Sequence, residues 1–129
     1  MNTKKLYKCL PALLIFVFAQ TDIMCQTQQA KINYTSFTVN AVKKRVTIDW
    51  VTDNKVPANY FEIQRSADGI NFKTIALVLG PDPQKSNCDC YECFDKPGAG
   101  TKKYFYRLKH ISTDGEIELS ETKMLAINK

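Results

Sequence analysis

The fold is decided by two stretches, YFEIQRSADGINF at residues 60–72 and YFYRLKHISTDG at residues 104–115. In both, apolar and polar residues alternate and the run then meets an Asp-Gly dipeptide, Asp68-Gly69 or Asp114-Gly115. Alternation with a period of two is typical of a strand with one buried face. Asp-Gly beside such a run is the strongest short-range signal for a hairpin. The two stretches therefore predict an all-β protein.

Further strand patterns follow at short spacing after residue 36. Every second residue from Val46 to Trp50 is apolar, and Phe61 and Ile63 repeat the pattern, so these side chains are expected to face the core. Predicted strands cover residues 37–42, 46–51, 60–65, 72–79, 91–95, 102–111 and 116–127, with loops or turns between them. Seven short strands at this spacing favour a β-sandwich.

Length and composition narrow the class of protein. The chain has 129 residues, which is enough for one domain. Its 44% hydrophobic and 24% charged residues are typical of a globular protein and exclude a disordered chain. The formal net charge is +5, but apart from Lys43-Lys44-Arg45 the positive residues are scattered. We therefore expect no nucleic-acid partner.

Residues 1–25 have the pattern of a signal peptide. Three lysines precede an apolar run at residues 10–19, which is too short to span a bilayer and suits the apolar region of a signal peptide. Cleavage is expected after Ala19 or after Cys25, and a polar lead follows over residues 26–35. No later stretch is apolar for long enough to span a membrane.

The mature protein is therefore expected to be exported, to the periplasm or to the cell surface and beyond. A lipid anchor at Cys25 is not expected. The approach to that cysteine is Asp22-Ile23-Met24, where a lipoprotein signal needs small residues.

The order of motifs resembles a fibronectin type III domain. Val46-x-Ile48-x-Trp50 precedes Tyr60-Phe61-Glu62-Ile63, and Pro97-Gly98 precedes Thr101-x-x-Tyr104-x-Tyr106-Arg107-Leu108. More narrowly, residues 61–72 and 106–115 are similar to the fibronectin type III-like modules of secreted Bacteroidetes proteins. The resemblance covers residues 36–127 and implies a seven-stranded antiparallel immunoglobulin-like sandwich.

The resemblance also implies structural roles on the predicted sixth strand. Tyr104 stands where such domains place the tyrosine whose hydroxyl ties the corner before that strand, and Tyr106 and Leu108 follow as structural residues. Modules of that group usually precede a C-terminal sorting segment. Because this chain ends at Lys129, just past the last predicted strand, periplasmic residence is favoured. No specific ligand is implied, since sandwiches of this kind host many unrelated roles.

Cys88-x-Cys90-x-x-Cys93 is the local motif with chemistry of its own. Together with His110, three thiols would match a Cys₃His structural zinc site, and the relevant strand ends share one pole of such a sandwich. Strand parity argues against a metal. Cys93 is in step with Tyr91 on the core face, whereas Cys88 and Cys90 point the other way. We therefore expect no metal and no cofactor.

Export to an oxidising compartment favours a disulfide instead. Cys88 could pair back to Cys93, or with Cys90 in a small ring. One thiol stays odd if cleavage falls after Cys25, and the count is four if cleavage falls after Ala19. Cys93 is expected to be buried, and Cys88 and Cys90 to be exposed at the start of their strand.

The sequence contains no nucleophile elbow, zinc-protease motif or glycine-rich phosphate loop, so we expect no enzyme. The single histidine, His110, is expected to be a strand-end residue with a hydrogen-bonded ring. The carboxylates of Asp68, Asp114, Glu116 and Glu118 are accounted for by turns and by outward strand positions.

Two classes of function remain. The first is a non-enzymatic envelope module that binds an unidentified protein or glycan through loops at 54–58, 80–87 and 112–116, because loops on a rigid sandwich are where binding normally occurs. The second is a small metal- or redox-responsive protein that uses the cluster of Cys88, Cys90 and Cys93.

Overall fold

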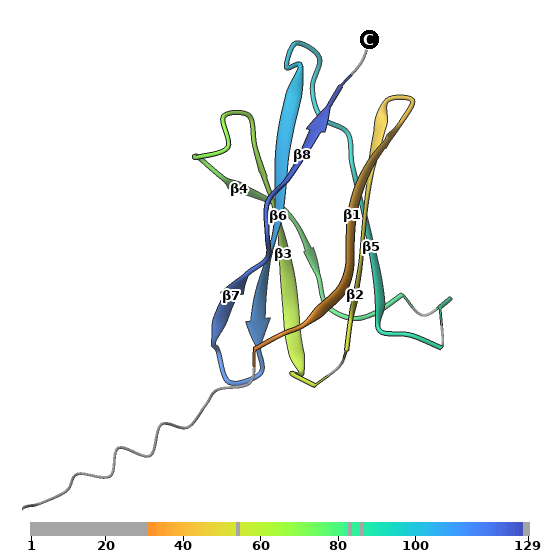
Figure 1. The fold of residues 1–129 in the computed structure, drawn as a ribbon, viewed down its shortest axis with the longest axis vertical. Coiled ribbons are helices and arrows are strands. Elements are labelled where there is room, and N and C mark those ends of the chain that lie inside the picture. Colours follow the sequence, from red (N-terminus) through yellow and green to blue (C-terminus); the bar gives the residue numbers. More distant parts are fainter. Residues whose placement is uncertain (1–30, 54, 83, 86, 128–129) are drawn as a thin grey trace, which may run out of the picture.

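The computed structural model describes residues 31–53, 55–82, 84–85 and 87–127, and the predicted signal peptide lies outside them. The described residues form eight strands and no helix, so the all-β prediction is confirmed (Figure 1). The strands are β1 (Tyr34–Val42), β2 (Arg45–Thr52), β3 (Ala58–Ser66), β4 (Lys73–Val78), β5 (Cys90–Asp95), β6 (Lys103–Ser112), β7 (Ile117–Leu119) and β8 (Lys123–Ala126). Nothing in this part of the chain is a helix of the length and apolarity needed to cross a membrane.

The eight strands are arranged in two antiparallel sheets. One sheet has three strands in the order β1-β2-β5. The other has five, in the order β4-β3-β6, with β7 and β8 both paired to β6. In Figure 1 the three-stranded sheet lies on the right and the five-stranded sheet on the left. Buried residues of both sheets form the core.

The first strand begins earlier than the alternation predicts. β1 starts at Tyr34 rather than at Phe37, and Ile32 before it is only 5% exposed. The last residues of the predicted polar lead, 26–35, therefore belong to the folded domain. The segment is mostly polar, and nothing in its composition indicated that Ile32 is buried and packs with the core.

The predicted last strand, residues 116–127, is wrong as a single element. The structure has β7 and β8 instead, so the strand count is eight rather than seven. Ser120 explains the interruption. Its backbone amide donates to Leu108 O at 2.9 Å, while its hydroxyl accepts from Leu108 N at 2.8 Å. The side chain thus takes the place of a backbone acceptor and the ladder breaks there.

The turn between β3 and β4 is organised by Asp68. The carboxylate accepts a hydrogen bond from the hydroxyl of Ser66 and others from the amides of Asn71 and Ile70, and these bonds lower the pKa of the carboxyl. Gly69 follows with φ 79°, a conformation that glycine adopts without strain. The Asp-Gly signal at this position therefore marks a hairpin turn.

Trp50 is the central aromatic residue of the core. It is fully buried, its ring stacks on Tyr91 with centroids 5.2 Å apart, and it meets Phe61 edge to face at 5.3 Å. The other buried apolar side chains are Ile32, Phe37, Val46, Ile48, Ile63, Cys93, Tyr104, Tyr106, Leu108 and Ile111. All six residues with predicted structural roles, Trp50, Phe61, Ile63, Tyr104, Tyr106 and Leu108, are buried.

Arg65, Asp95 and Tyr106 form a group of hydrogen bonds, which we call the polar tie, between the two sheets near the end of β3. Arg65 of β3 donates to both carboxylate oxygens of Asp95 of β5, at 2.9 and 2.7 Å. The hydroxyl of Tyr106 donates to the same carboxylate at 2.8 Å. Nearby, the hydroxyl of Tyr104 donates to the carbonyl of Gly98 at 3.2 Å, which ties the β5–β6 connection to β6.

The strand β4 lies at the edge of its sheet, because it pairs only with β3 among the described strands (Figure 1). Residues 74–79 carry no charge. Leu77 and Leu79 expose 60% and 77% of their surface. This edge is therefore both unpaired and apolar.

Candidate binding pole

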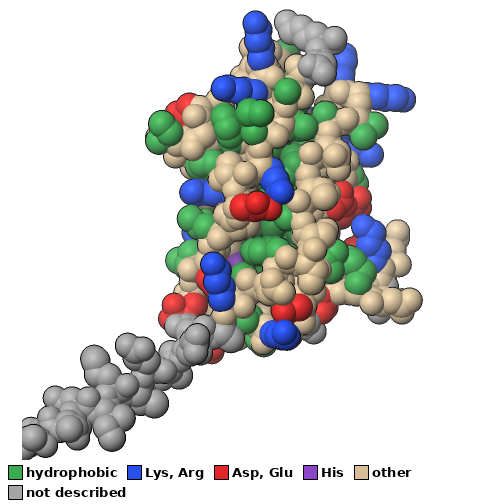
Figure 2. All heavy atoms as spheres, in the orientation of Figure 1, with side chains coloured by type: hydrophobic (Ala, Val, Ile, Leu, Met, Phe, Trp, Pro, Cys, Tyr) green, Lys and Arg blue, Asp and Glu red, His purple; other side chains and the backbone are tan. Residues whose placement is uncertain are grey.

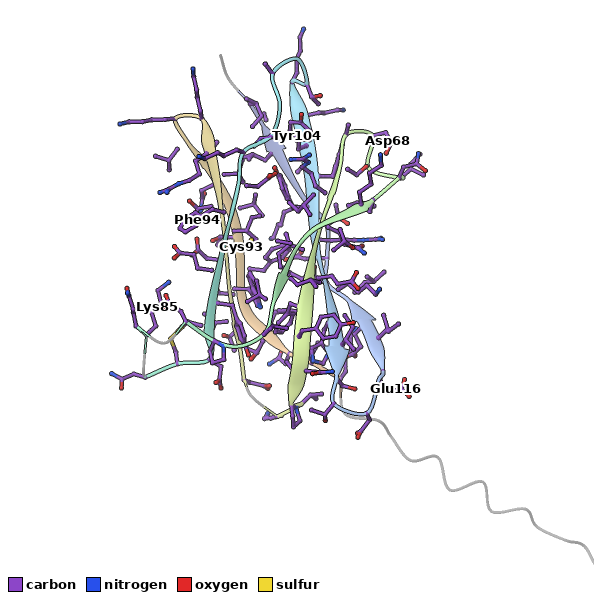
Figure 3. The ribbon with its side chains drawn as sticks, turned by 180° about the vertical axis from the view of Figure 1, so that it is seen from behind. Asp68, Lys85, Cys93, Phe94, Tyr104 and Glu116 are labelled. Atoms are coloured by element: carbon purple, nitrogen blue, oxygen red, sulfur yellow. A yellow bond between two sulfur atoms is a disulfide. The ribbon has the colours of Figure 1, made fainter. Side chains whose placement is uncertain are left out.

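Three strand connections lie at one end of the sandwich, which we call the binding pole: residues 53–57, 79–89 and 113–116 (lower end of Figure 1). In Figure 3, Lys85 of the second connection and Glu116 of the third lie on opposite sides of this end. The three loops predicted to be near one another therefore share an end, but the second stands apart from the third.

The first and third connections enclose a pocket of about 300 Å³. It is lined by Lys55, Val56 and Pro57 from one side and by Ser112, Thr113, Asp114, Glu116 and Glu118 from the other. Val56 and Pro57 give it an apolar wall opposite a polar one. An apolar wall with a few polar groups facing it is the usual composition of a ligand pocket.

Acidic groups outnumber basic groups around the pocket. Three of the lining residues are the carboxylates Asp114, Glu116 and Glu118, whereas Lys55 is the one basic residue that lines it. The Lys55 ammonium lies 3.4 Å from Asp53 Oδ2, so its charge is already paired. Figure 2 shows acidic side chains at this end of the molecule. The pocket is therefore suited to a group that donates hydrogen bonds or carries positive charge.

His110 and Glu118 face each other next to this pocket, on β6 and β7. His110 is fully buried, and its Nδ1 lies 3.6 Å from Glu118 Oε2. The same oxygen accepts a hydrogen bond from the amide of Ile32 at 2.9 Å, which ties the start of the domain to β7. The pairing of β6 with β7 sets His110 directly opposite Glu118, on the inner side of the sheet.

Two predictions about this pair are wrong. Neither ring nitrogen of His110 has a hydrogen-bond partner among the described residues, although a hydrogen-bonded ring was expected. Glu118 is not an outward strand residue, because the short strand β7 turns its side chain toward His110.

Further buried polar atoms without partners surround the same part of the core. Within the described residues, the hydroxyl of Tyr34 and Nε1 of Trp50 share this property with the His110 ring. All three side chains lie around Phe61, with ring centroids 5.2 to 6.4 Å from its own. Buried polar groups without partners cost free energy. This part of the core therefore contributes less to stability than an apolar core of the same size would.

Burial lowers the pKa of His110, and the carboxylate of Glu118 opposes that shift without cancelling it. Burial also raises the pKa of the nearby Tyr34 hydroxyl, with Glu118 adding to the effect. At neutral pH the histidine is therefore uncharged.

We expect mild acid to destabilise the fold through His110. Its folded pKa lies below its unfolded value of about 6.5, so the unfolded chain binds more protons as pH falls through that value. The free energy of unfolding should drop by up to about 1.4 kcal/mol per pH unit between pH 6.5 and 5.5. Urea unfolding at pH 7.5 and 5.5 measures this loss. His110→Leu should lose less stability over the same interval, and an equal loss would contradict the assignment to His110.

A disulfide joins Cys88 of the second connection to Cys90, the first residue of β5. Asp89, between the two cysteines, accepts a hydrogen bond from the amide of Thr52 at 3.2 Å. The carbonyl of Cys90 accepts another from the amide of Asp82 at 2.7 Å. The small disulfide ring therefore sits where the long connection joins the start of β5 and touches the end of β2.

Cys93 lies apart from this disulfide. It is a free thiol on the core side of β5, 9% exposed, and burial raises its pKa. Its burial was predicted from its parity with Tyr91, and that prediction is confirmed. Among the described residues no group of three or more His, Cys, Asp or Glu side chains is placed to hold a metal ion. The structure thus does not bring Cys88, Cys90, Cys93 and His110 together.

Comparisons with known proteins give a fold but no family. No family model matches the sequence, and no curated protein matches it. Solved structures with a similar fold include pectate lyase PelI from Erwinia chrysanthemi, with a TM-score of 0.58, 15% identity, and coverage of 76% of this chain and 28% of that chain. Pectate lyase Pel3 from Pectobacterium carotovorum has a TM-score of 0.57 and 15% identity, with coverage of 72% of this chain and 26% of that chain.

A β-1,2-glucanase from Parabacteroides distasonis is also similar, with a TM-score of 0.51, 20% identity, and coverage of 75% of this chain and 13% of that chain. The chain thus spans little more than a quarter of the length of these neighbours at most. At such identities the similarity concerns the fold of the shared region alone.

Proposed function

We propose that the two sheets form a fibronectin type III-like, immunoglobulin-like sandwich. The strand orders β1-β2-β5 and β4-β3-β6 with a final strand beside β6 support this assignment. So does the bond from the hydroxyl of Tyr104 to the carbonyl of Gly98, because it ties the corner before β6 as the tyrosine of such domains does.

On this scaffold the protein acts as a non-enzymatic, exported envelope module that holds a protein or glycan partner at the binding pole. The observation that carries this proposal is the pocket between the 53–57 and 113–116 connections, with acidic groups facing an apolar wall. Carboxylates accept hydrogen bonds from sugar hydroxyls and from basic side chains alike. The buried aromatic core beneath keeps the two connections in fixed relative positions.

A paired set of variants tests the role of the pole. Asp114→Asn combined with Glu116→Gln removes two charges at the pocket and leaves side-chain size nearly unchanged. Glu92→Gln, on β5 away from the pocket, is the matched control. We expect binding to a glycan array or to cross-linkable envelope proteins to fall at least tenfold for the double variant and to persist for the control. Equal retention in both variants would contradict a binding role for this pocket.

The proposal of a non-enzymatic role has its own test. The solved neighbours are pectate lyases and a β-1,2-glucanase, but the chain covers 28% or less of each of them. We expect purified protein incubated with polygalacturonate or with β-1,2-glucan to release no shorter products. Release that is lost in the Asp114→Asn and Glu116→Gln variant would make the pole a catalytic site instead.

A second candidate function, response to metal or redox state, uses the cysteines. The disulfide between Cys88 and Cys90 favours redox over metal chemistry, because paired sulfurs are not thiolate ligands. Elemental analysis together with alkylation before and after reduction separates the two. Stoichiometric zinc with Cys88, Cys90 and Cys93 all reduced would establish the metal-binding alternative.

Export is the third part of the proposal, and it predicts a processed N-terminus. The lysine-rich start and the short apolar run at 10–19 are typical of a cleaved signal. N-terminal sequencing of protein from the cell envelope should begin at Gln20 or at Gln26. An intact Met1 on cytoplasmic protein would show that no export signal operates.

A further inference from the structure

We propose that the Cys88–Cys90 disulfide is an exchange site for small thiols, with attack at Cys88, and that opening it releases the contact between Thr52 and Asp89 at the binding pole. The chemistry of this proposal rests on the proposed redox function of the cysteines. Its structural effect rests on the proposed role of the binding pole. It assigns a substrate class, low-molecular-weight thiols such as glutathione, to the disulfide at the start of β5.

Accessibility decides which sulfur is attacked. Cys88 is exposed, whereas Cys90 is half-buried at the first position of β5. An incoming thiolate must approach along the line of the S–S bond, and the exposed sulfur offers that approach. Cys90 is then the leaving group. Cys88 Sγ also lies 3.8 Å from the carbonyl of Lys85, so the thiol released there has an acceptor within reach.

Cys93 takes no part in this exchange. Its side chain lies on the core face of β5, and neighbouring strand positions alternate between faces, so it points away from the sulfur of Cys90. Burial raises the pKa of the Cys93 thiol, which keeps it protonated and unreactive. Among the cysteines that the structure describes, the exchange therefore involves Cys88 and Cys90, and Cys93 does not act as a resolving thiol.

The reaction balances with two external thiols. A thiolate RS⁻ attacks Cys88 Sγ, the Cys88–Cys90 bond breaks, and Cys90 leaves as a thiolate that takes a proton from water. A second RS⁻ attacks the sulfur of the R group in the mixed disulfide, forming RSSR and releasing Cys88, which is protonated in turn. The protein gains two electrons and two protons, and two molecules of RSH are oxidised to RSSR.

Opening the ring acts on the pole through Asp89. This residue lies between the two cysteines, and its carbonyl accepts the amide of Thr52, the last residue of β2. The connection that begins after Thr52 forms one wall of the pocket. While the ring is closed, Asp89 is held between two fixed neighbours. Once the ring is open, the bond to Thr52 loses that support. The fold itself should persist, because a ring of three residues removes little entropy from the unfolded chain.

Reduced glutathione under anaerobic conditions is the probe, and peptide mapping after alkylation is the readout. We expect two new alkylated cysteines per chain, Cys88 and Cys90, with Cys93 unlabelled. Cys90→Ser, treated with oxidised glutathione, should accumulate an adduct on Cys88 at least tenfold faster than Cys88→Ser accumulates one on Cys90. Cys93→Ala is the matched control and should exchange like the parent. Resistance to millimolar glutathione, or labelling of Cys93 alongside the pair, would overturn the exchange site.

Amide hydrogen exchange at Thr52 tests the second half of the proposal. We expect at least a tenfold loss of protection on reduction, with the amides of β6 unchanged. Unchanged protection at Thr52 would separate the disulfide from the pole and overturn the coupling. Neither readout uses a binding partner, so failure of the proposed binding function leaves these results interpretable.

Discussion

Replacing Trp50 with alanine should lower the free energy of unfolding by about 3–5 kcal/mol, the usual cost of removing a large aromatic side chain from a packed core. The indole is fully buried and contacts rings from both sheets, Tyr91 on β5 and Phe61 on β3. Its loss leaves a cavity that neither neighbour fills without moving away from the other. Urea unfolding followed by circular dichroism measures the effect.

Phe94→Ala is the matched control for this experiment. Phe94 is an aromatic residue on the outward face of β5, 48% exposed, with Arg45 stacked over its ring at 4.3 Å. Its truncation should cost less than about 1.5 kcal/mol, because much of the ring is already in contact with water. A Trp50→Ala midpoint equal to that of Phe94→Ala would mean that the sheets do not pack as described.

Asp95→Ala should be the next most destabilising change, at about 2–4 kcal/mol. The carboxylate is 11% exposed and accepts hydrogen bonds from Arg65 and from Tyr106, so its removal leaves a guanidinium and a hydroxyl without their partner between the sheets. The free energy of unfolding in urea at pH 7 gives the size of the loss.

Glu121→Ala serves as the control for the polar tie. Its pair with Lys123 has a short distance, 2.8 Å, but its side chain is 65% exposed, so its loss should cost about 0–1 kcal/mol. The double variant of Arg65→Met and Asp95→Ala should be less destabilised than the two single losses together, since the unpaired charge is gone. Additive losses would show that Arg65 and Asp95 are not coupled.

Local alternation was enough to predict most of the strands. Val46 to Trp50 and Phe61 to Ile63 alternate strictly, and the same residues are buried in the two facing sheets. Alternation failed where the cause was a single long-range contact. Ser120 interrupts the last strand because its hydroxyl meets the amide of Leu108, and nothing in the neighbouring sequence marks that pairing.

The candidate site was less predictable than the fold. The loops could be assigned to one end from strand order, and the burial of Cys93 could be predicted from strand parity. The inward orientation of Glu118 could not be predicted, because it depends on which residue of β6 faces the short strand β7. The tie of Arg65 to Asp95 was also missed. Arg65 and Asp95 lie on strands far apart in the sequence, so no local pattern links them. Asp95 does have the same strand parity as the core residues Tyr91 and Cys93, and this could have suggested that its carboxylate needs a buried partner.

The unpaired edge of β4 has a practical consequence for handling the protein. Its backbone groups on the side away from β3 have no strand partner, and after Lys73, the first residue of β4, residues 74–79 contain none of the charges and prolines that usually blunt such edges. Exposed edge strands of this kind pair between molecules at high protein concentration, and they do so more readily when a core substitution has lowered the stability of the fold. The Trp50→Ala protein should therefore aggregate or form a gel at a lower protein concentration than the parent does. A lysine in place of Leu77 would keep both in solution.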